Sequence, residues 1–167
     1  VVIGDFDSLN KTVLTELKKE KVPILTFPKK KNETDSELVL QYAIQKGYTD
    51  IIVFGWLGSR LDHTLANLML FAGQKKSVSI TIVEPEQTLS VVRDSLELHG
   101  KKGDLVSLIP LTGNARGVST TGLKWELKDE TLRFGKTRGI SNVLTGKKAQ
   151  VTITEGILLV ITFTRPL

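Results

Sequence analysis

The chain contains no cysteine among its 167 residues. Disulfides, thiolate zinc sites and cysteine nucleophiles are therefore excluded, and a reducing compartment, the cytoplasm, is the expected location. Long hydrophobic runs are also lacking: the longest, 51–57 and 157–161, are shorter than the about 20 residues that span a bilayer. No GxxxxGK[ST] sequence occurs, so a Walker A phosphate loop is excluded.

The composition provides enough hydrophobic residues, 40%, to build a core in one domain or two small ones. The net charge of +5 is uneven, because residues 1–99 hold 12 Lys and Arg against 13 Asp and Glu, whereas residues 100–167 hold 11 against 5. A basic second half suits an anionic partner, either a nucleotide or a nucleic acid. A solvated, lysine-rich surface is the simpler explanation.

Strand and helix patterns alternate over residues 1–84, which we expect to form an α/β domain. A capping box at Thr34–Glu37 begins a helix that ends at Gly47, and Gly73 ends another. Strands separated by helices predict a parallel sheet with right-handed crossovers. The expected helices cover 9–20, 34–47 and 61–72, and the expected strands cover 1–3, 22–27, 50–54 and 77–83.

Helical periodicity disappears after residues 84–86, and short β-rich runs broken by Gly, Asn, Asp and Lys follow. Residues 85–167 are therefore predicted to form a small antiparallel sandwich or barrel. The expected fold is a Rossmann-like parallel α/β domain at 1–84 followed by a C-terminal antiparallel β-sandwich at 85–167. The expected strands are 89–98, 105–109, 117–121, 123–127, 131–134, 149–154 and 157–164.

Two aspartates, Asp5 and Asp7, follow the apolar run that opens the chain. While the chain stays extended, residues at i and i+2 share a face, so both carboxylates can point at one ligand beyond the strand end. Like charges this close repel unless a cation separates them, and Mg²⁺ is the usual choice where phosphates are handled. The alternative is a solvated turn in which Asp7 or Ser8 caps the next helix.

A second acidic cluster contains Asp35, which directly follows the expected cap residue Thr34. The simpler role of Asp35 and Glu37 is to support the helix start through the helix dipole and the capping box. In a parallel sheet, Asp35 would also reach the same carboxyl edge as Asp5 and Asp7. A third carboxylate there would complete a Mg²⁺ site with room for phosphate oxygens.

A glycine-containing turn at 55–63 joins an expected strand to an expected helix. Its glycines let the backbone approach a ligand, and a helix N-terminus offers free N–H groups to phosphate. Arg60 adds a guanidinium that can bind an anion through two hydrogen bonds. In the simpler interpretation Asp62 caps the helix and His63 packs. The dinucleotide-binding fingerprint is absent, because its third glycine and distant acid are missing.

These three clusters, in this order, resemble the thiamine pyrophosphokinases. The matching sequences are GDFDS at 4–8, TDSE at 34–37 and G-x-x-G-x-R-x-D-H at 55–63. Later segments resemble the β-domain of that family, so the resemblance covers essentially the whole chain. These segments are VSLIPL at 106–111, TGLKW at 121–125 and GISN at 139–142.

The resemblance implies an enzyme that pairs an α/β domain with a β-sandwich domain and works as a homodimer. Such enzymes transfer the pyrophosphoryl group of ATP to the hydroxyl of thiamine, giving thiamine diphosphate and AMP. Thiamine lies between the α/β domain of one subunit and the β-domain of the other. Neither nucleic acid nor a membrane is an expected partner.

The resemblance also assigns site residues, position by position. Pyrophosphoryl transfer needs charge neutralisation and alignment, and a cationic, aromatic thiamine suits an aromatic face with amide or hydroxyl partners. Taken alone, Trp125 would be a core residue, and Ser141 with Asn142 would be a turn. The expected catalytic and Mg²⁺-binding residues are Asp5, Asp7 and Asp35; the expected ATP-binding residues are Gly58, Ser59, Arg60, Asp62 and His63; and the expected thiamine-binding residues are Trp125, Ser141 and Asn142.

The chain departs from the family at its start. The family carries an earlier strand and an Ala-Asp-Gly-Gly motif, and this chain also lacks an initiator methionine, so we expect a fragment truncated at its N-terminus. In addition, Asn32 stands where many relatives place an acid.

Two other functions fit parts of the sequence. A haloacid-dehalogenase-like Mg²⁺-dependent phosphatase would use Asp5 as nucleophile, but Gly4, Ser8 and the lack of a later Lys and paired-acid motif disfavour it. A non-enzymatic basic β-barrel could bind nucleic acid, but the late aromatic residues are too few for a stacking platform. These residues are Trp125, Phe134 and Phe163.

Overall fold

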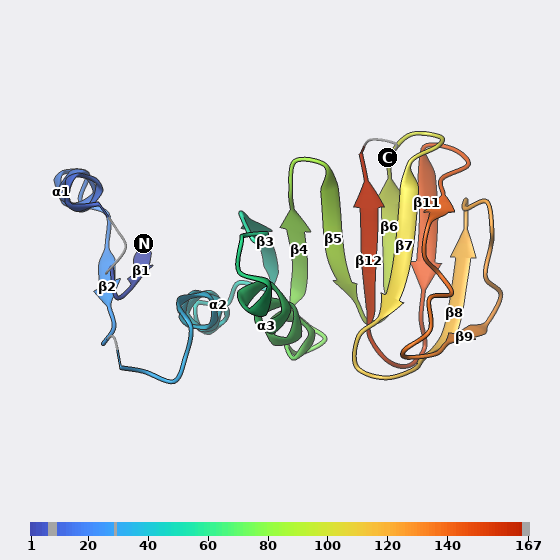
Figure 1. Ribbon diagram of the computed structural model, residues 1–167, viewed down its shortest axis with the longest axis horizontal. Helices are drawn as coiled ribbons and strands as arrows, with labels where there is room; N and C mark the ends of the chain where they lie inside the picture. Colours follow the sequence, from blue (N-terminus) through green and yellow to red (C-terminus); the bar gives the residue numbers. More distant parts are fainter. Residues whose placement is uncertain (7–9, 29, 165–167) are drawn as a thin grey trace. The chain divides into compact units, whose positions relative to one another are not determined.

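The computed structural model describes residues 1–6, 10–28 and 30–164. The chain is a mixed α/β protein with few helices and several sheets, and it divides into two compact units, Val1–Tyr48 and Thr49–Leu167 (Figure 1). None of the helices in this described part combines the length and the hydrophobicity needed to cross a membrane.

The N-terminal unit contains a two-stranded sheet made of β1 (Val2–Gly4) and β2 (Ile24–Thr26). The two strands are parallel, as expected from the helical crossover between them. That crossover is α1 (Lys11–Lys19), and α2 (Asp35–Gln45) follows β2 and packs against β1. Each strand is only three residues long, so the ladder contributes few hydrogen bonds to this unit.

The cap of α1 differs from the expectation. Asn10 is the N-cap residue, and its Oδ1 accepts a hydrogen bond from the backbone N–H of Thr12 at 2.9 Å. The prediction that Asp7 or Ser8 caps this helix is therefore wrong, and both residues lie outside the described ranges. An asparagine two residues further on satisfies the same need, because its amide oxygen bonds the N2 backbone donor.

The start and the end of α2 follow the sequence pattern. Thr34 is the N-cap, and its Oγ1 accepts a hydrogen bond from the backbone N–H of Glu37 at 3.2 Å. The carboxylate of Glu37 accepts a bond from Gln41, one turn further along the helix, at 3.1 Å. After the helix, Gly47 has a φ of 87°, the left-handed conformation in which glycine ends helices without strain.

The C-terminal unit is built on a six-stranded and a four-stranded sheet. The larger sheet has the order β10-β7-β12-β5-β4-β3, and the smaller has the order β6-β11-β8-β9. The strands of the larger sheet are β3 (Asp50–Phe54), β4 (Ser79–Val83), β5 (Gln87–Val92), β7 (Leu105–Pro110), β10 (Asn142–Val143) and β12 (Leu158–Phe163). Those of the smaller sheet are β6 (Ser95–His99), β8 (Ala115–Thr121), β9 (Glu130–Leu132) and β11 (Lys148–Thr152).

The strand pairing in the six-stranded sheet changes from parallel to antiparallel across its width. β3 and β4 are parallel and are connected by α3 (Leu61–Ala72), whereas the other neighbouring pairs are antiparallel. β4 precedes Pro85 and β5 follows it, and these two strands pair directly. The helix-containing part and the all-β part therefore share one continuous sheet, with the change of character close to residue 85.

A single hydrophobic cluster joins the two sheets of this unit. Val106 and Leu158 come from the six-stranded sheet, while Val118 and Val151 come from the four-stranded sheet, and each is fully buried. Alternate residues of a strand point to the same face, so each sheet presents one apolar face to this cluster. Full burial of each such side chain stabilises the fold by roughly 1.5–3 kcal/mol.

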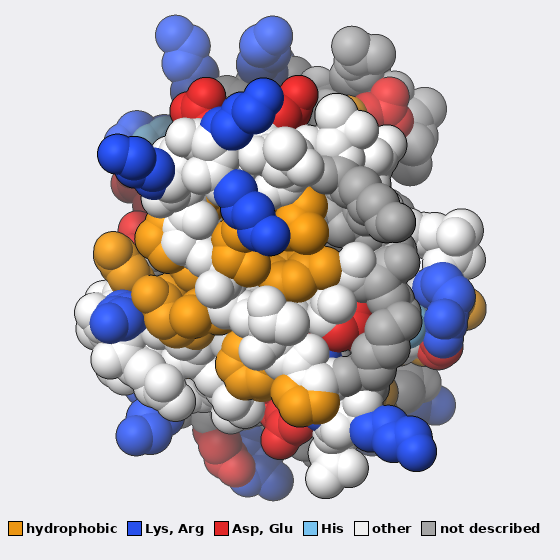
Figure 2. Space-filling view, turned by 90° about the vertical axis from the view of Figure 1, so that its left-hand side faces the viewer, with side chains coloured by type: hydrophobic (Ala, Val, Ile, Leu, Met, Phe, Trp, Pro, Cys, Tyr) orange, Lys and Arg blue, Asp and Glu red, His pale blue; other side chains and the backbone are white. Residues whose placement is uncertain are grey.

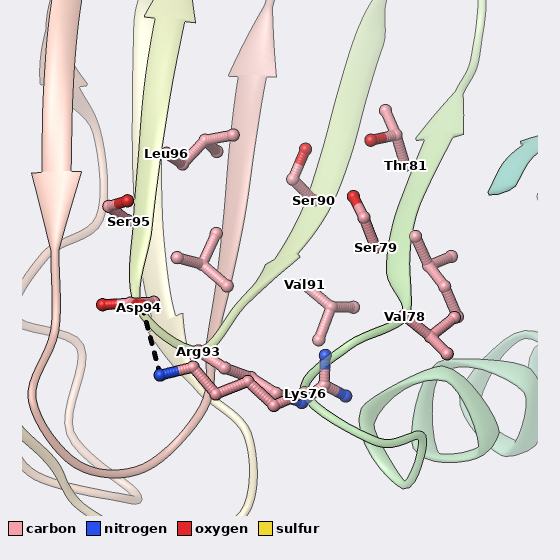
Figure 3. Close-up of a pocket in the computed structure, with 12 residues that line it drawn as sticks. Lys76, Val78, Ser79, Thr81, Ser90, Val91, Arg93, Asp94, Ser95 and Leu96 are labelled. Atoms are coloured by element: carbon pink, nitrogen blue, oxygen red, sulfur yellow. Dashed lines mark ion pairs between the residues drawn. The ribbon is translucent and has the colours of Figure 1, made fainter. Parts of the chain in front are cut away.

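The run 89–98, expected as one strand, is two strands in different sheets. β5 and β6 are separated at Arg93 and Asp94, and the Arg93 guanidinium donates to the carbonyls of Phe71 (3.0 Å) and Ala72 (2.8 Å). Those carbonyls belong to the last turn of α3, where a cation is favourable. Figure 3 shows the cavity at this break, with an ion pair of 3.1 Å between Lys76 and Asp94.

The segment 123–127 is also not the expected strand. Leu123 makes an isolated bridge to Leu144, and the preceding Gly122 has a φ of 76°. The chain turns here, and the backbone of Trp125 is bonded to the side chain of Asn142 instead of to a neighbouring strand.

Candidate active site

The first candidate group lies in the N-terminal unit, where Asp5 follows β1 and Asp35 opens α2. A Cβ atom added to Gly4, the last residue of β1, would come within 3.0 Å of the Asp35 Oδ2. The carboxylate of Asp35 therefore lies directly against the end of β1. The structure thus brings Asp5 and Asp35 to the same strand end, and Asp7 lies outside the described residues.

Asp5 and residue 7 would share one face only if the chain between them were extended. Phe6 has a φ of 58°, which lies in the left-handed region, so the chain turns at this point. Strand alternation therefore does not hold at Phe6. Within the described ranges, which omit Asp7, no three His, Asp or Glu side chains are grouped so that they could hold a metal ion.

Lys31 is a member of this group that the sequence analysis missed. Its Nζ lies 2.6 Å from the Oδ1 of Asp35 and 6.0 Å from the centroid of the Phe27 ring. Only 12% of the Lys31 side chain is exposed, against 51% of the Asp35 side chain. The spacing of four residues between a lysine and an aspartate was a usable signal, but Lys31 lies in a run of lysines that is typical of a solvated surface.

The second candidate group is the turn after β3. Gly55 has a φ of 65°, and the backbone N–H groups of Trp56 and Leu57 both donate to the Glu84 Oε1, at 2.8 and 2.9 Å. Glu84 directly follows β4, which is parallel to β3, so both strands end at this edge. Glu84 was missed because its neighbour Pro85 marked the segment as a linker.

An open hollow lies at this edge of the sheet, where β3 and β4 end. It is lined by Phe54, Gly55, Val83, Glu84 and Pro85. Ligands of α/β sheets bind outside the carboxyl ends of the strands, and this hollow occupies that position. The cavity of Figure 3 is lined in part by Val78, which precedes β4, and by Ser79, its first residue, so it lies toward the opposite end of these strands.

Arg60 and Asp62 form an exposed ion pair in the same turn. The guanidinium donates from Nε to Oδ1 at 3.0 Å and from Nη2 to Oδ2 at 2.5 Å. The hydrogen bonds from Arg60 hold the pKa of Asp62 well below its ordinary value. Arg60 occupies the N-cap position of α3 and makes no side-chain cap bond, so the interpretation of Asp62 as the cap residue is wrong.

The remaining predicted residues of this turn are accessible. Gly58, Ser59 and His63 are all exposed, so the interpretation of His63 as a packed side chain is wrong. A Cβ at Gly58 would meet no atom within 4 Å. The structure therefore gives no internal reason for glycine at this position, in contrast to Gly55 with its positive φ.

The third candidate group surrounds Trp125. The Asn142 side chain is buried; its Nδ2 donates to the Trp125 carbonyl at 2.7 Å, and its Oδ1 accepts from the N–H groups of Trp125 (3.1 Å) and Val143 (2.9 Å). Trp125 itself is 55% exposed, so its interpretation as a core residue is wrong. Lys124 places its Nζ 4.6 Å from the centroid of the indole.

Ser141 adjoins this group and has a φ of 58°. Its backbone N–H donates to the Oγ of the buried Ser107 at 3.1 Å, which anchors the residue to β7. Ser141 is an exposed residue. The three residues predicted to bind thiamine therefore lie together, with Trp125 and Ser141 accessible and Asn142 buried between backbone groups.

The second and third groups lie at opposite edges of one sheet. The turn 55–63 follows β3, and Asn142 belongs to β10, which is the other edge strand. Five strand spacings of about 4.8 Å separate these edges, roughly 24 Å in all. The two groups of one chain are therefore far apart along this sheet.

Comparison with known proteins gives matches over almost the whole chain. The family model for the catalytic domain of thiamin pyrophosphokinase matches residues 1–82, and the model for the vitamin B1 binding domain of thiamin pyrophosphokinase matches residues 80–158. The junction between the two models falls at the end of β4.

Individual relatives agree with these models. The thiamine pyrophosphokinase of Bacillus subtilis is 28% identical over 95% of this chain and 75% of its own length. Thiamin pyrophosphokinase 1 of Caenorhabditis elegans is 28% identical over 87% of this chain, which spans 62% of that relative. The crystal structure of the Bacillus subtilis enzyme superposes with a TM-score of 0.86 at 27% identity, covering 98% of this chain and 78% of that one.

The fold, a mixed α/β arrangement in which the sheet changes from parallel to antiparallel pairing, thus matches that of a known pyrophosphokinase. Because both family models match in the same order along the chain, the chain belongs to the thiamin pyrophosphokinase family.

Proposed function

We propose that this chain transfers the pyrophosphoryl group of ATP to the hydroxyl of thiamine and releases AMP. The observation that carries the proposal is the match of residues 1–82 to the catalytic and 80–158 to the vitamin B1 binding model of one family. We assign residues 1–84 to a Rossmann-like α/β catalytic domain and residues 85–167 to a thiamine-binding β-sandwich, in a cytoplasmic enzyme. Neither a phosphatase nor a nucleic-acid-binding module is supported by the comparisons.

The reaction makes defined demands on the protein. The hydroxyl oxygen of thiamine attacks the β-phosphorus of ATP, the bond from that phosphorus to the oxygen bridging the α-phosphate breaks, and AMP leaves with this oxygen. The hydroxyl proton is released. Such a transfer depends on alignment of the two substrates and on neutralisation of phosphate charge rather than on covalent catalysis.

The acidic group of the N-terminal unit fits a magnesium site. Asp5 and Asp35 provide carboxylate oxygens at one strand end, and a glycine at position 4 leaves room for the Asp35 carboxylate. Mg²⁺ prefers this type of donor and keeps several waters and phosphate oxygens as its other ligands. Asp5, Asp7 and Asp35 would hold the ion, which when bound would neutralise charge on the phosphates of ATP.

Arg60 is suited to exchange Asp62 for a phosphate. Both side chains of this ion pair are exposed to solvent, so breaking the pair costs little free energy. A guanidinium can form the same pair of parallel hydrogen bonds with phosphate oxygens as with a carboxylate. We assign Gly58, Ser59, Arg60, Asp62 and His63 to the ATP site on this basis.

Trp125 supplies an exposed aromatic face for the cationic ring of thiamine. Asn142 already uses its amide to bind the backbone of Trp125 and Val143, which supports a positioning role for this residue. Ser141 offers an accessible hydroxyl beside them. The ammonium of Lys124, now over the indole, would have to leave the face that thiamine occupies.

We further propose that the enzyme is a homodimer. The turn 55–63 and the Trp125 group lie at opposite edges of one sheet, about 24 Å apart by strand spacing, whereas the reaction requires ATP and thiamine to be in contact. A two-fold axis that places the Trp125 group of one chain beside the ATP site of its partner satisfies this requirement.

The proposed reaction is tested by measuring AMP formation from ATP and Mg²⁺ by the full-length protein, with and without thiamine. We expect AMP and thiamine diphosphate in equal amounts, and AMP only when thiamine is present. Phosphate release without thiamine would indicate a phosphatase instead. Tight, salt-dependent binding of an oligonucleotide together with no AMP would indicate the nucleic-acid alternative.

A further inference from the structure

Lys31 is held in an arrangement that a surface lysine does not need. Its side chain is nearly nine-tenths buried, and its Nζ is 2.6 Å from the Asp35 Oδ1. Lysine is among the residue types that are almost never buried unless they are paired. The neighbouring Lys30, in the same run, is exposed. The inward position of Lys31 is therefore a specific feature of the fold rather than a property of the basic run.

The surroundings of Lys31 are the end of β2 and the beginning of α2. The ammonium lies 6.0 Å from the centroid of the Phe27 ring, which follows β2, and 2.6 Å from the Oδ1 of Asp35, the first residue of α2. The backbone N–H of Phe27 donates to the Gly4 carbonyl at 3.0 Å, so this lysine lies at the same strand ends as the candidate metal ligands.

The same carboxylate cannot serve two cations equally. A divalent ion bound to the Asp35 carboxylate would repel the ammonium that now lies 2.6 Å from the Oδ1. Lysine has a flexible four-carbon stem and three donors, so its ammonium can move to a new acceptor while the stem remains packed. The phosphates of ATP, which arrive with the metal, provide that acceptor, because lysine binds phosphate as a point charge.

We propose that Lys31 is a phosphate-binding residue that neutralises Asp35 in the resting protein and moves to a phosphate oxygen of ATP when Mg²⁺ takes its place. This inference rests on the proposed function, because it requires the nucleotide to bind at the acidic strand end. It also assigns Asp35 a cationic partner in both states. The exchange keeps the carboxylate oriented before the metal arrives.

The first part of the proposal, that Lys31 competes with the metal for Asp35 in the resting protein, is tested by measuring Mn²⁺ binding to the full-length protein without nucleotide. Electron paramagnetic resonance monitors this binding. Lys31→Met removes the competing ammonium, and we expect Mn²⁺ to bind roughly two- to fivefold more tightly. Lys30→Met is the matched control and should leave this affinity unchanged. Unchanged or weaker Mn²⁺ binding by the Lys31→Met variant overturns the proposal.

Steady-state kinetics tests the second part of the proposal, the contact between Lys31 and a phosphate of ATP. We expect Lys31→Met to raise the KM for ATP about tenfold or more and Lys31→Arg to raise it less, with the KM for thiamine unchanged in both. A purely structural role would instead lower the melting temperature and leave the KM for ATP unaffected, which would contradict the proposal. If the wild-type protein forms no thiamine-dependent AMP, the proposed function fails, and the Mn²⁺ measurement still decides whether Lys31 competes with the metal.

Discussion

The N-terminal unit and the C-terminal unit are stabilised in different ways. Among the described residues of the first unit, the buried hydrophobic side chains are Leu38 and Leu40, and its strands have three residues each. The second unit has a continuous hydrophobic cluster between two sheets. The first unit therefore fully buries few of its described apolar side chains, whereas the second has a core of its own.

The two units also differ in how their polar side chains are bonded. Asn142 is buried and has its amide bonded to the backbone of Trp125 and Val143, so this site is complete without a ligand. Asp35 is half exposed and is held by Lys31, a partner that a metal can replace. Under the proposed assignment, the Trp125 group is therefore preformed, while the Asp35 group would be completed by its ligands.

Hydrophobic side chains gather between Lys and Arg side chains on the face shown in Figure 2. Separately, the edge strand β3 of the C-terminal unit carries exposed apolar side chains: Phe54 is 71% exposed and Ile52 is 57% exposed, and Met69 of α3 is also 71% exposed. Apolar groups of this size usually become covered by a partner or a further element when they are grouped. The C-terminal unit thus has a complete interior next to an incompletely covered edge strand.

The largest effect is expected in the core of the second unit. Leu158 is fully buried in the cluster between the sheets, so Leu158→Ala should lower the free energy of unfolding by about 2–5 kcal/mol. Urea denaturation measures this change. The control Leu65→Ala removes a side chain that is 46% exposed and should change stability much less. Equal losses in the two variants would refute the contrast between core and edge.

The second effect concerns Asn142, whose side chain binds the backbone of the proposed thiamine site. Asn142→Ala leaves one carbonyl and two N–H groups near Trp125 without their side-chain partner, which should cost about 2–3 kcal/mol. Thermal or urea denaturation checks it, with Asn32→Ala at an exposed position as control. Unchanged stability with weakened thiamine binding would instead assign Asn142 a direct contact with the substrate.

Hydrogen exchange sharpens the comparison between the units. The amides of β1 and β2 should open with a free energy at least about 2 kcal/mol smaller than those of β12, because their unit buries few apolar groups. ATP with Mg²⁺ should slow exchange in residues 1–48 more than in β12. Uniform protection across the chain, before and after ligand, would show that both units open together.

The smallest expected effect concerns the pH dependence of stability that comes from Asp62 in the second unit. Hydrogen bonds from Arg60 lower the pKa of Asp62, so its contribution to stability is present above the unfolded-state value of about 3.9 and is lost as the pH falls through the lower folded value. The pair is exposed, so the change in stability is small. Carbon NMR should show Asp62 ionised below its ordinary range, and Arg60→Met should return its pKa to near 3.9. Ordinary titration of Asp62 in the wild type would contradict the pairing.

The sequence predicted features that depend on local chemistry. The cap at Thr34 and the glycine at 47 require only neighbouring backbone groups, and both appear as expected. The break at Arg93 could not be predicted, because it depends on carbonyl groups at the end of α3, more than twenty residues away. The same holds for Asn142, whose partner Trp125 lies 17 residues earlier.

For the candidate site, the sequence predicted residue types but not how their side chains are arranged. The position of acidic residues at strand ends predicted Asp5 and Asp35 as site residues, because strand ends are where α/β sheets bind ligands, and the structure places the Asp35 carboxylate against Gly4 at the end of β1. Lys31 and Glu84 were missed, since a lysine run and a proline-containing junction resemble solvated surface and linker. Only the structure shows the groups that they contact, which are the Asp35 carboxylate for Lys31 and the N–H groups of Trp56 and Leu57 for Glu84.

The composite site is tested most directly by mixing two inactive variants of the full-length protein. Asp35→Asn damages the metal side, and Trp125→Ala damages the thiamine side at an exposed position. If each site uses both chains, random exchange of subunits gives heterodimers with one intact site, and roughly a quarter of the wild-type AMP formation should return. No return of activity, although mass spectrometry shows heterodimers, would place the whole site within one chain and contradict the account.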